Sequence, residues 1–325
     1  MSSHQKFDNY SLETIDTSLL VSSNRRISKA ENEKLYNASC TIGAFYMAAE
    51  CFNACHELED LFRLAYEFMS LSKEEKMNYY RKDSRKFCGY CPDMSKSDDI
   101  VDKLSGDLNK CESYSIVGNY DSNVKRLNYQ YAFDNFTVSR PKGFSALLGE
   151  YYKTMESLAG LLMDGYECSL GLPAGTVQQF TQHPGSFLRV QHYSSNNLPA
   201  KTQEVGIPGH TDFQWLTIIL QDHNPGLQIE VDDIWYNIKP QDGCFIVLVD
   251  DQATLWTNGR LRACPHRVIN TSGVERYSLI FLYSVDHEKK VAVVPAHNIT
   301  KELPNKYFIP GEYIAQRRRE TFGDY

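Results

Sequence analysis

Two histidines and one aspartate have the residue types and the spacing needed to hold a catalytic metal ion. His210 and Asp212 are separated by one residue at the edge of a β-rich run, and residues two apart on a strand project from the same face. His266 stands 54 residues after Asp212, in a second β-rich run that a closed barrel can bring beside the first. Two imidazoles and one carboxylate leave coordination positions open, which suits a ferrous ion better than a structural zinc ion. We therefore predict that His210, Asp212 and His266 are iron ligands.

A carboxylate anchor is predicted near that metal. Arg276 and Ser278 lie ten and twelve residues after His266, and on a strand they share one face. A guanidinium binds a carboxylate through two parallel hydrogen bonds, and a serine hydroxyl can donate a third. The ligand of this site is therefore expected to carry a carboxylate group.

The first half of the chain has helical patterns that can support such a site. Apolar residues recur at three- and four-residue spacing over residues 35–68, and Ser72 begins a capping-box sequence for a further helix. A polar stretch over residues 82–107 predicts a surface loop. Residues 141–170 predict another helix, which ends before Gly171.

The second half, from Phe187, consists of short β-rich runs separated by Gly, Pro, Asn and Asp. Such runs at close intervals predict antiparallel strands of a sandwich or barrel. The chain is expected to end in a helix from about Gly311. The seven runs are FLRVQHY, QWLTIIL, GLQIEV, IWYNI, CFIVLVD, HRVIN and YSLIFLYSV.

Composition excludes several classes of function. The 41 acidic residues outnumber the 34 basic ones, so the net charge of −7 offers no basic field for nucleic acid. No apolar run approaches the length of a bilayer span, and the first residues lack the pattern of a secretory leader. Nine cysteines, an odd number, indicate a reducing compartment rather than a disulfide framework. We predict a cytoplasmic protein without membrane or nucleic-acid partners.

These motifs resemble those of the iron(II)- and 2-oxoglutarate-dependent dioxygenases of the isopenicillin-N-synthase-like family. That pattern is His-X-Asp, a distal His and then Arg-X-Ser, and both the residues and the spacing agree here. The segment Leu188-Arg189-X-Gln191-His192-Tyr193 is similar to the family's Leu-Arg-X-Asn-Tyr-Tyr. One departure is Leu248-Val249-Asp250-Asp251, where the family has Asn-X-Gly-Asp.

The resemblance implies a mainly β fold with flanking helices, built on a double-stranded β-helix, or jelly roll. It divides the chain into a helical N-terminal region (residues 1–180) packed on the core, a jelly-roll core (181–290) and a C-terminal segment (291–325). These parts are expected to form one compact unit, as a monomer or a weak homodimer.

The resemblance also implies a chemistry. Fe(II) would be the cofactor and 2-oxoglutarate and O2 the cosubstrates, with ascorbate as a candidate reductant. The distal carboxylate of 2-oxoglutarate would meet Arg276 and Ser278, with Tyr193 and Arg189 assisting. The expected reaction is oxidation of a C–H bond of a small-molecule metabolite, in specialised metabolism. Candidates for the substrate pocket are Phe213, Trp215, Leu282, Ser284, Tyr90 and Tyr114.

Two other interpretations remain open on the sequence alone, and a third, a dithiol redox module, is disfavoured. An iron oxidase of the same fold that does not consume 2-oxoglutarate would use Arg276 and Ser278 to bind a carboxylate of its substrate. Cys88 and Cys91 have the spacing of a dithiol redox motif, but they lie in a polar loop without the βαβ pattern such a motif needs. A non-catalytic small-molecule-binding protein could keep the barrel and lose the chemistry.

Overall fold

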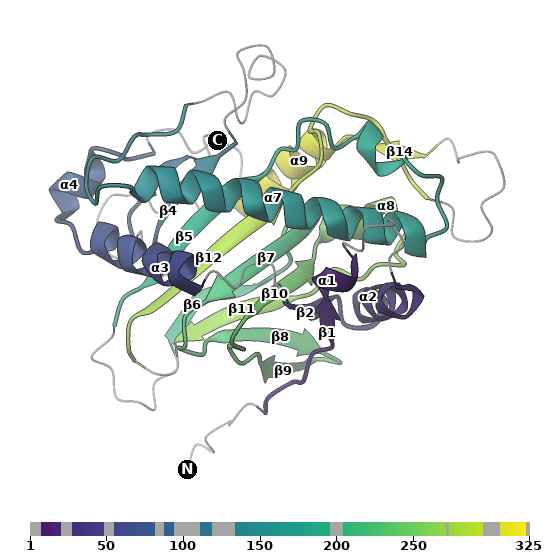
Figure 1. Cartoon of the computed structure of the whole chain (residues 1–325), viewed down its shortest axis with the longest axis horizontal. Helices are drawn as coiled ribbons and strands as arrows, with labels where there is room; N and C mark the ends of the chain where they lie inside the picture. The colour runs from purple at the N-terminus through teal and green to yellow at the C-terminus, as the bar shows by residue number, and fades with distance from the viewer. Residues whose placement is uncertain are drawn as a thin grey trace.

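Two facing β-sheets form the centre of the molecule. The computed structural model describes residues 8–20, 28–48, 55–81, 88–93, 111–118, 134–195, 204–270, 273–294 and 306–322. A larger sheet has eight strands and a smaller one has four, and helices cover the outer face of the larger sheet. Figure 1 shows the long helix α7 (Phe144–Ser169) crossing strands of the larger sheet.

The larger sheet joins strands from both halves of the chain. Its first pair is parallel and all its other pairs are antiparallel. In spatial order the strands are β1 (Thr14–Asp16), β2 (Ala44–Ala48), β10 (Cys244–Val249), β7 (Leu216–Gln221), β12 (Arg276–Tyr283), β5 (Phe187–Tyr193), β4 (Glu112–Val117) and β3 (Gly89–Cys91).

The smaller sheet is antiparallel throughout. Its strands are β6 (Glu204–His210), β11 (His266–Asn270), β8 (Leu227–Val231) and β9 (Ile234–Asn237), in that order, and a separate hairpin-like pair joins β13 (Val291–Ala292) to β14 (Tyr307–Phe308). Two facing antiparallel sheets with helices on the outside form the jelly roll that the sequence predicts. The predicted fold class is confirmed.

Alternation along β12 divides its side chains between two environments. Tyr277, Leu279 and Phe281 belong to the main hydrophobic core under the helices. Arg276 and Ser278 point to the opposite face, into the space between the sheets. The helices therefore hold the outer face of the sheet, and the inner face is left for the site.

The helical side of the core is dominated by aromatic rings. Phe68, at the end of α3 (Cys55–Met69), lies with its ring centroid 4.8 Å from that of Tyr114 and 5.0 Å from that of Phe144, the first residue of α7. Buried aromatic pairs at these separations contribute more than their buried area alone. Helix α7 ends where the sequence predicts, because Gly171 follows with φ of +64°.

One sequence-based expectation, a helical pattern over residues 35–68, is wrong in its middle. The structure has helix α2 (Lys29–Thr41), then strand β2, then α3. Gly43 adopts φ of +75°, and a Cβ there would collide with the Arg262 carbonyl oxygen. The backbone therefore turns at Gly43 and enters the sheet between β1 and β10, because pairing with two strands outweighs local helical spacing.

The other predicted elements are largely present. All seven predicted strands occur, while the sequence did not predict β1, β2, β3, β4, β6, β13 and β14. The capping box at Ser72 begins α4 (Lys73–Met77). Most of the predicted loop at residues 82–107 lies outside the described residues. The remaining helices are α1 (Thr17–Leu20), the 3-10 turn η3 (Val177–Gln179), α8 (Asp251–Trp256) and α9 (Pro310–Phe322).

None of the helices in the described parts of the chain has both the length and the apolar character needed to cross a membrane.

Candidate metal and cosubstrate site

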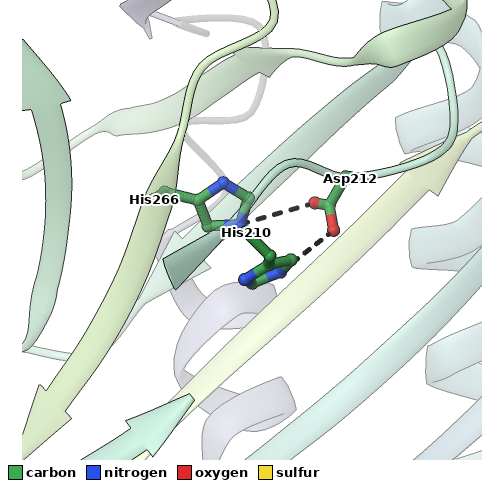
Figure 2. Close-up of side chains that lie close together, drawn as sticks. All are labelled: His210, Asp212 and His266. Atoms are coloured by element: carbon green, nitrogen blue, oxygen red, sulfur yellow. Dashed lines mark ion pairs between the residues drawn. The ribbon is translucent and has the colours of Figure 1, made fainter. Parts of the chain in front are cut away.

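The three predicted metal ligands meet at one end of the smaller sheet. His210 ends β6 and His266 begins β11, and the two residues are register partners. Their Nε2 atoms lie 3.4 Å from Asp212 Oδ1 and 3.6 Å from Asp212 Oδ2, respectively. Figure 2 shows the three side chains pointing toward one another, and one potential ligand atom from each lies within 4.8 Å of the others. The predicted convergence of these residues is confirmed.

The way in which Asp212 reaches the site differs from the expectation. The spacing of His210 and Asp212 predicts that they share one strand face, but β6 ends at His210 and Asp212 lies in the connection to β7. The backbone N–H of Asp251 donates to the Asp212 carbonyl oxygen at 3.0 Å. Asp212 is therefore positioned by a fixed loop rather than by strand alternation.

Both imidazole rings are oriented by backbone carbonyl groups. His210 Nδ1 donates to the Pro208 carbonyl oxygen at 2.9 Å, and His266 Nδ1 donates to the Cys264 carbonyl oxygen at 3.1 Å. A carbonyl oxygen only accepts, so in the neutral rings the Nδ1 atoms carry the hydrogens and the Nε2 lone pairs face Asp212. Two lone pairs directed at a carboxylate need a cation between them, and a metal-binding histidine commonly has this arrangement. The residues present therefore fit a bound iron ion.

The charges at this site also favour a cation. Burial and the neighbouring His210 lower the pKa of His266 to about 4, so His266 is neutral at pH 7 and can be a ligand. Burial alone would raise the pKa of Asp212, but His266, His210 and a hydrogen bond from Thr217 outweigh it and lower that pKa. Burial acts to lower the pKa of His210, but the hydrogen bond to Asp212 and the charge of Asp212 outweigh it, so the pKa of His210 is raised above its ordinary value.

The predicted carboxylate anchor shares a cavity with these ligands. Arg276 and Ser278 are each 1% exposed and line the same cavity as His210, Asp212 and His266. Arg276 Nη2 donates to Gln221 Oε1 at 2.9 Å and Arg276 Nε donates to the Asn224 carbonyl oxygen at 3.3 Å. These two bonds fix the guanidinium and leave its other nitrogen for a ligand.

Two buried donors in this cavity have no hydrogen-bond partner in the structure. They are Arg276 Nη1 and the Tyr193 hydroxyl, and the Arg276 guanidinium carbon lies 5.0 Å from the centroid of the Tyr193 ring. Burial raises the pKa of Tyr193, so its hydroxyl keeps its proton. Buried donors are rarely left unsatisfied, and a carboxylate placed between these two would satisfy both. The site therefore fits the distal carboxylate of 2-oxoglutarate.

Arg189 lines the same cavity farther from the anchor. On β5 it is the register partner of Ile280, whereas Tyr193 is the partner of Arg276. Arg189 Nε donates to Ser115 Oγ at 3.3 Å, and its guanidinium carbon lies 5.3 Å from the centroid of the Phe187 ring. The two arginines therefore occupy different parts of one cavity.

Two of the six substrate-pocket candidates lie at or beside this cavity. Leu282 lines it directly, two residues beyond Ile280 on β12. Phe213 follows the predicted metal ligand Asp212 and is half-buried, with the Arg317 guanidinium of α9 4.9 Å from its ring centroid. Helix α9 therefore packs against the loop that carries Asp212.

The other four candidates lie away from the cavity, in the core. Trp215 packs against Trp256 with 4.9 Å between ring centroids, and Ser284 donates to Gln252 Oε1. Tyr90 and Tyr114 are register partners on β3 and β4, with their rings in the core under the helices. Strand alternation accounts for Tyr90 and Tyr114, whereas Trp215 and Ser284 lie just outside β7 and β12. None of these four residues is among those that line the cavity, where the sequence-based assignment had placed them.

Sequence reasoning missed several residues that shape the site. Gln221 and Asn224 orient Arg276, and Thr217 Oγ1 donates to Asp212 Oδ2 at 2.7 Å. Thr217 is fully buried, and it is the one polar residue within the apolar run LTIIL. The sequence signal that could have identified Thr217 is a polar residue inside an apolar strand, five residues after the predicted ligand Asp212.

Known families match both halves of the chain. The 2OG-Fe(II) oxygenase superfamily model matches residues 184–285, which include the metal ligands and the anchor. The model for the N-terminal region of non-haem dioxygenases in morphine synthesis matches residues 12–128. The chain belongs to the 2OG-Fe(II) oxygenase superfamily and is a non-haem iron(II)- and 2-oxoglutarate-dependent dioxygenase, with O2 as the other cosubstrate.

Individual relatives agree with this class. Clavatol oxidase from Penicillium crustosum is 32% identical over 156 residues, which is 46% of each chain, so this chain matches less than half of that protein. Gibberellin 20 oxidase 2 from Arabidopsis thaliana is 26% identical over 86% of this chain and 71% of its own length. A full-length Neurospora crassa protein, solved in complex with alpha-KG and thymine, has a TM-score of 0.80 at 19% identity, covering 98% of this chain and 100% of its own. That similarity shows the fold.

Proposed function

We propose that this dioxygenase oxidises a C–H bond of a small-molecule metabolite in specialised metabolism. The observation that carries the proposal is the single cavity that holds the His210, Asp212 and His266 cluster together with the two unsatisfied donors of Arg276 and Tyr193. The names of the relatives clavatol oxidase and gibberellin 20 oxidase 2, and the thymine in the Neurospora crassa structure, support a small organic substrate.

The roles of the protein groups follow from their positions. When bound, iron supplies the activation of O2 that couples conversion of 2-oxoglutarate to succinate and CO2 with oxidation of the substrate. His210, Asp212 and His266 would hold that ion. Arg276 and the Tyr193 hydroxyl would bind the distal carboxylate of 2-oxoglutarate, with Ser278 beside them, and so orient its other end toward the metal.

Arg189 and the apolar lining define the rest of the cavity. Phe187, over which the Arg189 guanidinium lies, is the register partner of Leu282, and Thr217 is the other register partner of Leu282. Because Thr217 bonds to Asp212, the Arg189 guanidinium lies on the metal side of Ile280. We therefore propose that Arg189 contacts the substrate or the metal-bound end of 2-oxoglutarate, while Leu282 contacts the substrate body.

An anaerobic titration with Fe(II) and 2-oxoglutarate tests the cosubstrate site. Chelation of iron by 2-oxoglutarate produces a weak visible charge-transfer band, which we expect in the wild-type protein. Arg276→Ala should raise the 2-oxoglutarate concentration needed for half of that band by about 10- to 100-fold, since a charge-assisted hydrogen bond contributes about 1.5–3 kcal/mol. Iron binding should stay within about twofold of wild type, because Arg276 is not a ligand.

Arg267 offers a matched control for that experiment. It follows His266 on β11, but its Nε donates to Gln228 and its guanidinium stacks 4.1 Å from the Trp235 ring centroid. Arg267→Ala should leave the titration unchanged. An Arg276→Ala protein with wild-type 2-oxoglutarate dependence would remove Arg276 from the assigned role, and a substrate screen that detects succinate would then test the reaction separately.

Location and assembly are part of the same proposal. The cysteine content and the acidic composition support a cytosolic protein without nucleic-acid partners. We further propose that it is a monomer or a weak homodimer, which sedimentation at micromolar concentration would test.

A further inference from the structure

The hydroxyl of Thr217 lies between two carboxyl groups, of which only one belongs to the metal site. Its Oγ1 is 2.7 Å from Asp212 Oδ2 and 2.9 Å from Asp250 Oδ2. Thr217 is fully buried and Asp250 is 1% exposed. The metal ligand Asp212 is thus connected through one hydroxyl to a second acid in the interior.

The number of hydrogens determines how this chain of groups can be arranged. A threonine hydroxyl has one hydrogen, so it can donate to one of the two acids and must accept a hydrogen from the other. Asp212 faces the two imidazoles, whereas Asp250 Oδ1 has no hydrogen-bond partner in the structure. A buried ionised carboxylate with so few partners is very costly, so Asp250 is the acid that carries the proton. Burial, reinforced by the charge of Asp212, raises the pKa of Asp250 well above its ordinary value.

We propose that Asp250 is a positioning residue of the metal centre, in which its carboxylic acid donates to Thr217 Oγ1 and the Thr217 hydroxyl donates to Asp212 Oδ2. This relay occupies Oδ2 and leaves Oδ1 of Asp212 as the oxygen for the ion. The inference rests on the proposed role of Asp212 as an iron ligand, and it adds the group that selects the ligand oxygen.

The backbone around Asp250 supports a fixed geometry. The Asp250 N–H donates to the Trp215 carbonyl oxygen at 3.1 Å, and the Asp251 N–H donates to the Asp212 carbonyl oxygen at 3.0 Å. Thr217 and Leu248 are register partners on β7 and β10. All three members of the relay are thus held by neighbouring backbone. The family pattern has glycine where this chain has Asp250, so the acid end of the relay is a feature of this chain rather than of the pattern.

Cobalt(II) binding to the full-length apoprotein, followed by its visible absorption, tests the relay without turnover. Hydrogen-bond partners of metal ligands contribute about 10- to 100-fold to metal affinity, and we expect a loss in that range for Thr217→Val. Asp250→Ala should lose less, about 3- to 10-fold, because Thr217 can still donate to Asp212 without being oriented. Asp250→Asn should stay within about twofold of wild type, because an amide N–H can donate to Thr217 as the acid does.

A double-mutant cycle separates a relay from two independent effects. If Asp250 acts only through Thr217, Asp250→Ala should cause no further loss of cobalt affinity in the Thr217→Val background. Thr257→Val is a matched control, because Thr257 is also fully buried but donates to the Ala253 carbonyl oxygen within helix α8 and the turn after it. It should lower the melting temperature and leave cobalt affinity unchanged.

Each outcome decides the proposal. Additive losses, or an Asp250→Asn protein as weak as Asp250→Ala, would overturn the relay while leaving the metal site intact. A loss of cobalt affinity in Thr257→Val equal to that in Thr217→Val would show that the effect is general destabilisation. If Thr217→Val fails to fold, the cobalt affinities of Asp250→Asn and Asp250→Ala still test the relay. A wild-type apoprotein that binds no cobalt would instead overturn the assigned metal site itself.

Discussion

Asp212 and Glu112 are two largely buried carboxylates among the described residues that lie beside histidine, and only Asp212 belongs to a cluster that could hold a metal ion. Asp212 lies between His210 and His266 in the space between the sheets. Glu112, on β4, lies beside His192 on β5. Both acids are largely shielded from solvent, with side-chain exposures of 14% and 10%. Burial next to histidine therefore does not by itself distinguish a metal site from a structural ion pair.

The difference lies in which atoms of the neighbours face the acid. Glu112 accepts hydrogen bonds from Lys76 Nζ at 2.7 Å, from His192 Nδ1 at 2.8 Å and from the Tyr90 hydroxyl. Burial raises the pKa of Glu112, but the bonds from His192, Lys76 and Tyr90 outweigh it and lower that pKa to about 2. These three hydrogen bonds satisfy the acceptor atoms of the Glu112 carboxylate without a metal ion.

Asp212 has a different set of neighbours. Its two histidines have already given their Nδ1 hydrogens to backbone carbonyl groups, so they present lone pairs to the acid. Thr217 supplies the one neutral donor. The backbone carbonyl groups of Pro208 and Cys264 accept the Nδ1 hydrogens, so each ring has its Nε2 lone pair free to bind a metal ion. This is why the cluster is suited to a metal ion rather than to an ion pair.

The largest expected effect is the loss of turnover when Asp212 is replaced. Asp212→Ala removes the one carboxylate ligand, and iron-dependent succinate release should fall by at least about 1,000-fold, in line with loss of a group essential to a catalytic unit. Cobalt affinity should fall with it. Glu112→Gln is the control and should retain cobalt binding. Turnover by Asp212→Ala within about tenfold of wild type would contradict the role of Asp212.

Glu112 should instead matter for stability. Glu112→Gln leaves the buried Lys76 ammonium without its counter-charge, and removing one partner of a buried pair costs about 3–5 kcal/mol in the free energy of unfolding. Urea unfolding monitored by tryptophan fluorescence measures this change. An unchanged midpoint together with lost cobalt binding would reverse the roles that we assign to the two acids.

The affinity for a metal should depend on pH with a slope of one proton. The pKa of His210 is raised, so below that pKa a metal must displace one proton from His210, and affinity falls as pH falls. The pKa of His266 is about 4, so His266 contributes no second proton until the pH approaches that value. Cobalt affinity should therefore fall about tenfold per pH unit between about pH 6 and pH 5. A fall of about a hundredfold per unit would mean that both rings are protonated.

The smallest expected effect is the acid dependence of stability. The pKa of Glu112 in the folded protein is about 2, below the value of about 4.3 in an unfolded chain, so the folded state favours the ionised form. Its contribution is complete above about pH 4.3 and is lost as the pH falls toward 2. The difference in unfolding free energy between wild type and Glu112→Gln should be constant from about pH 7 to about pH 5 and shrink below it. A difference that grows on acidification would contradict this account.

The chemical content of the site could be predicted from the sequence. His210, Asp212 and His266, together with Arg276 and Ser278, carry their chemistry in residue type and spacing, and the cavity contains all five. Seven strands of the second half could also be predicted, because short apolar runs bounded by turn residues have few other solutions, whereas β6, with Gly206, Pro208 and Gly209, could not. The end of α7 at Gly171 has a local cause as well.

What the tertiary structure decided depends on neighbours distant in the chain. Residues 44–48 belong to a stretch whose apolar residues have helical spacing, yet they form strand β2 and pair with β10 from the other half of the chain. Local spacing carries no information about such a distant partner. The same limit applies to Trp215 and Tyr114, whose burial on the outer face depends on which helices cover the sheet. It applies most to the contact between Thr217 on β7 and Asp250, the residue after β10, because that contact depends on the register and direction of β7 and β10, which only the assembled sheet establishes.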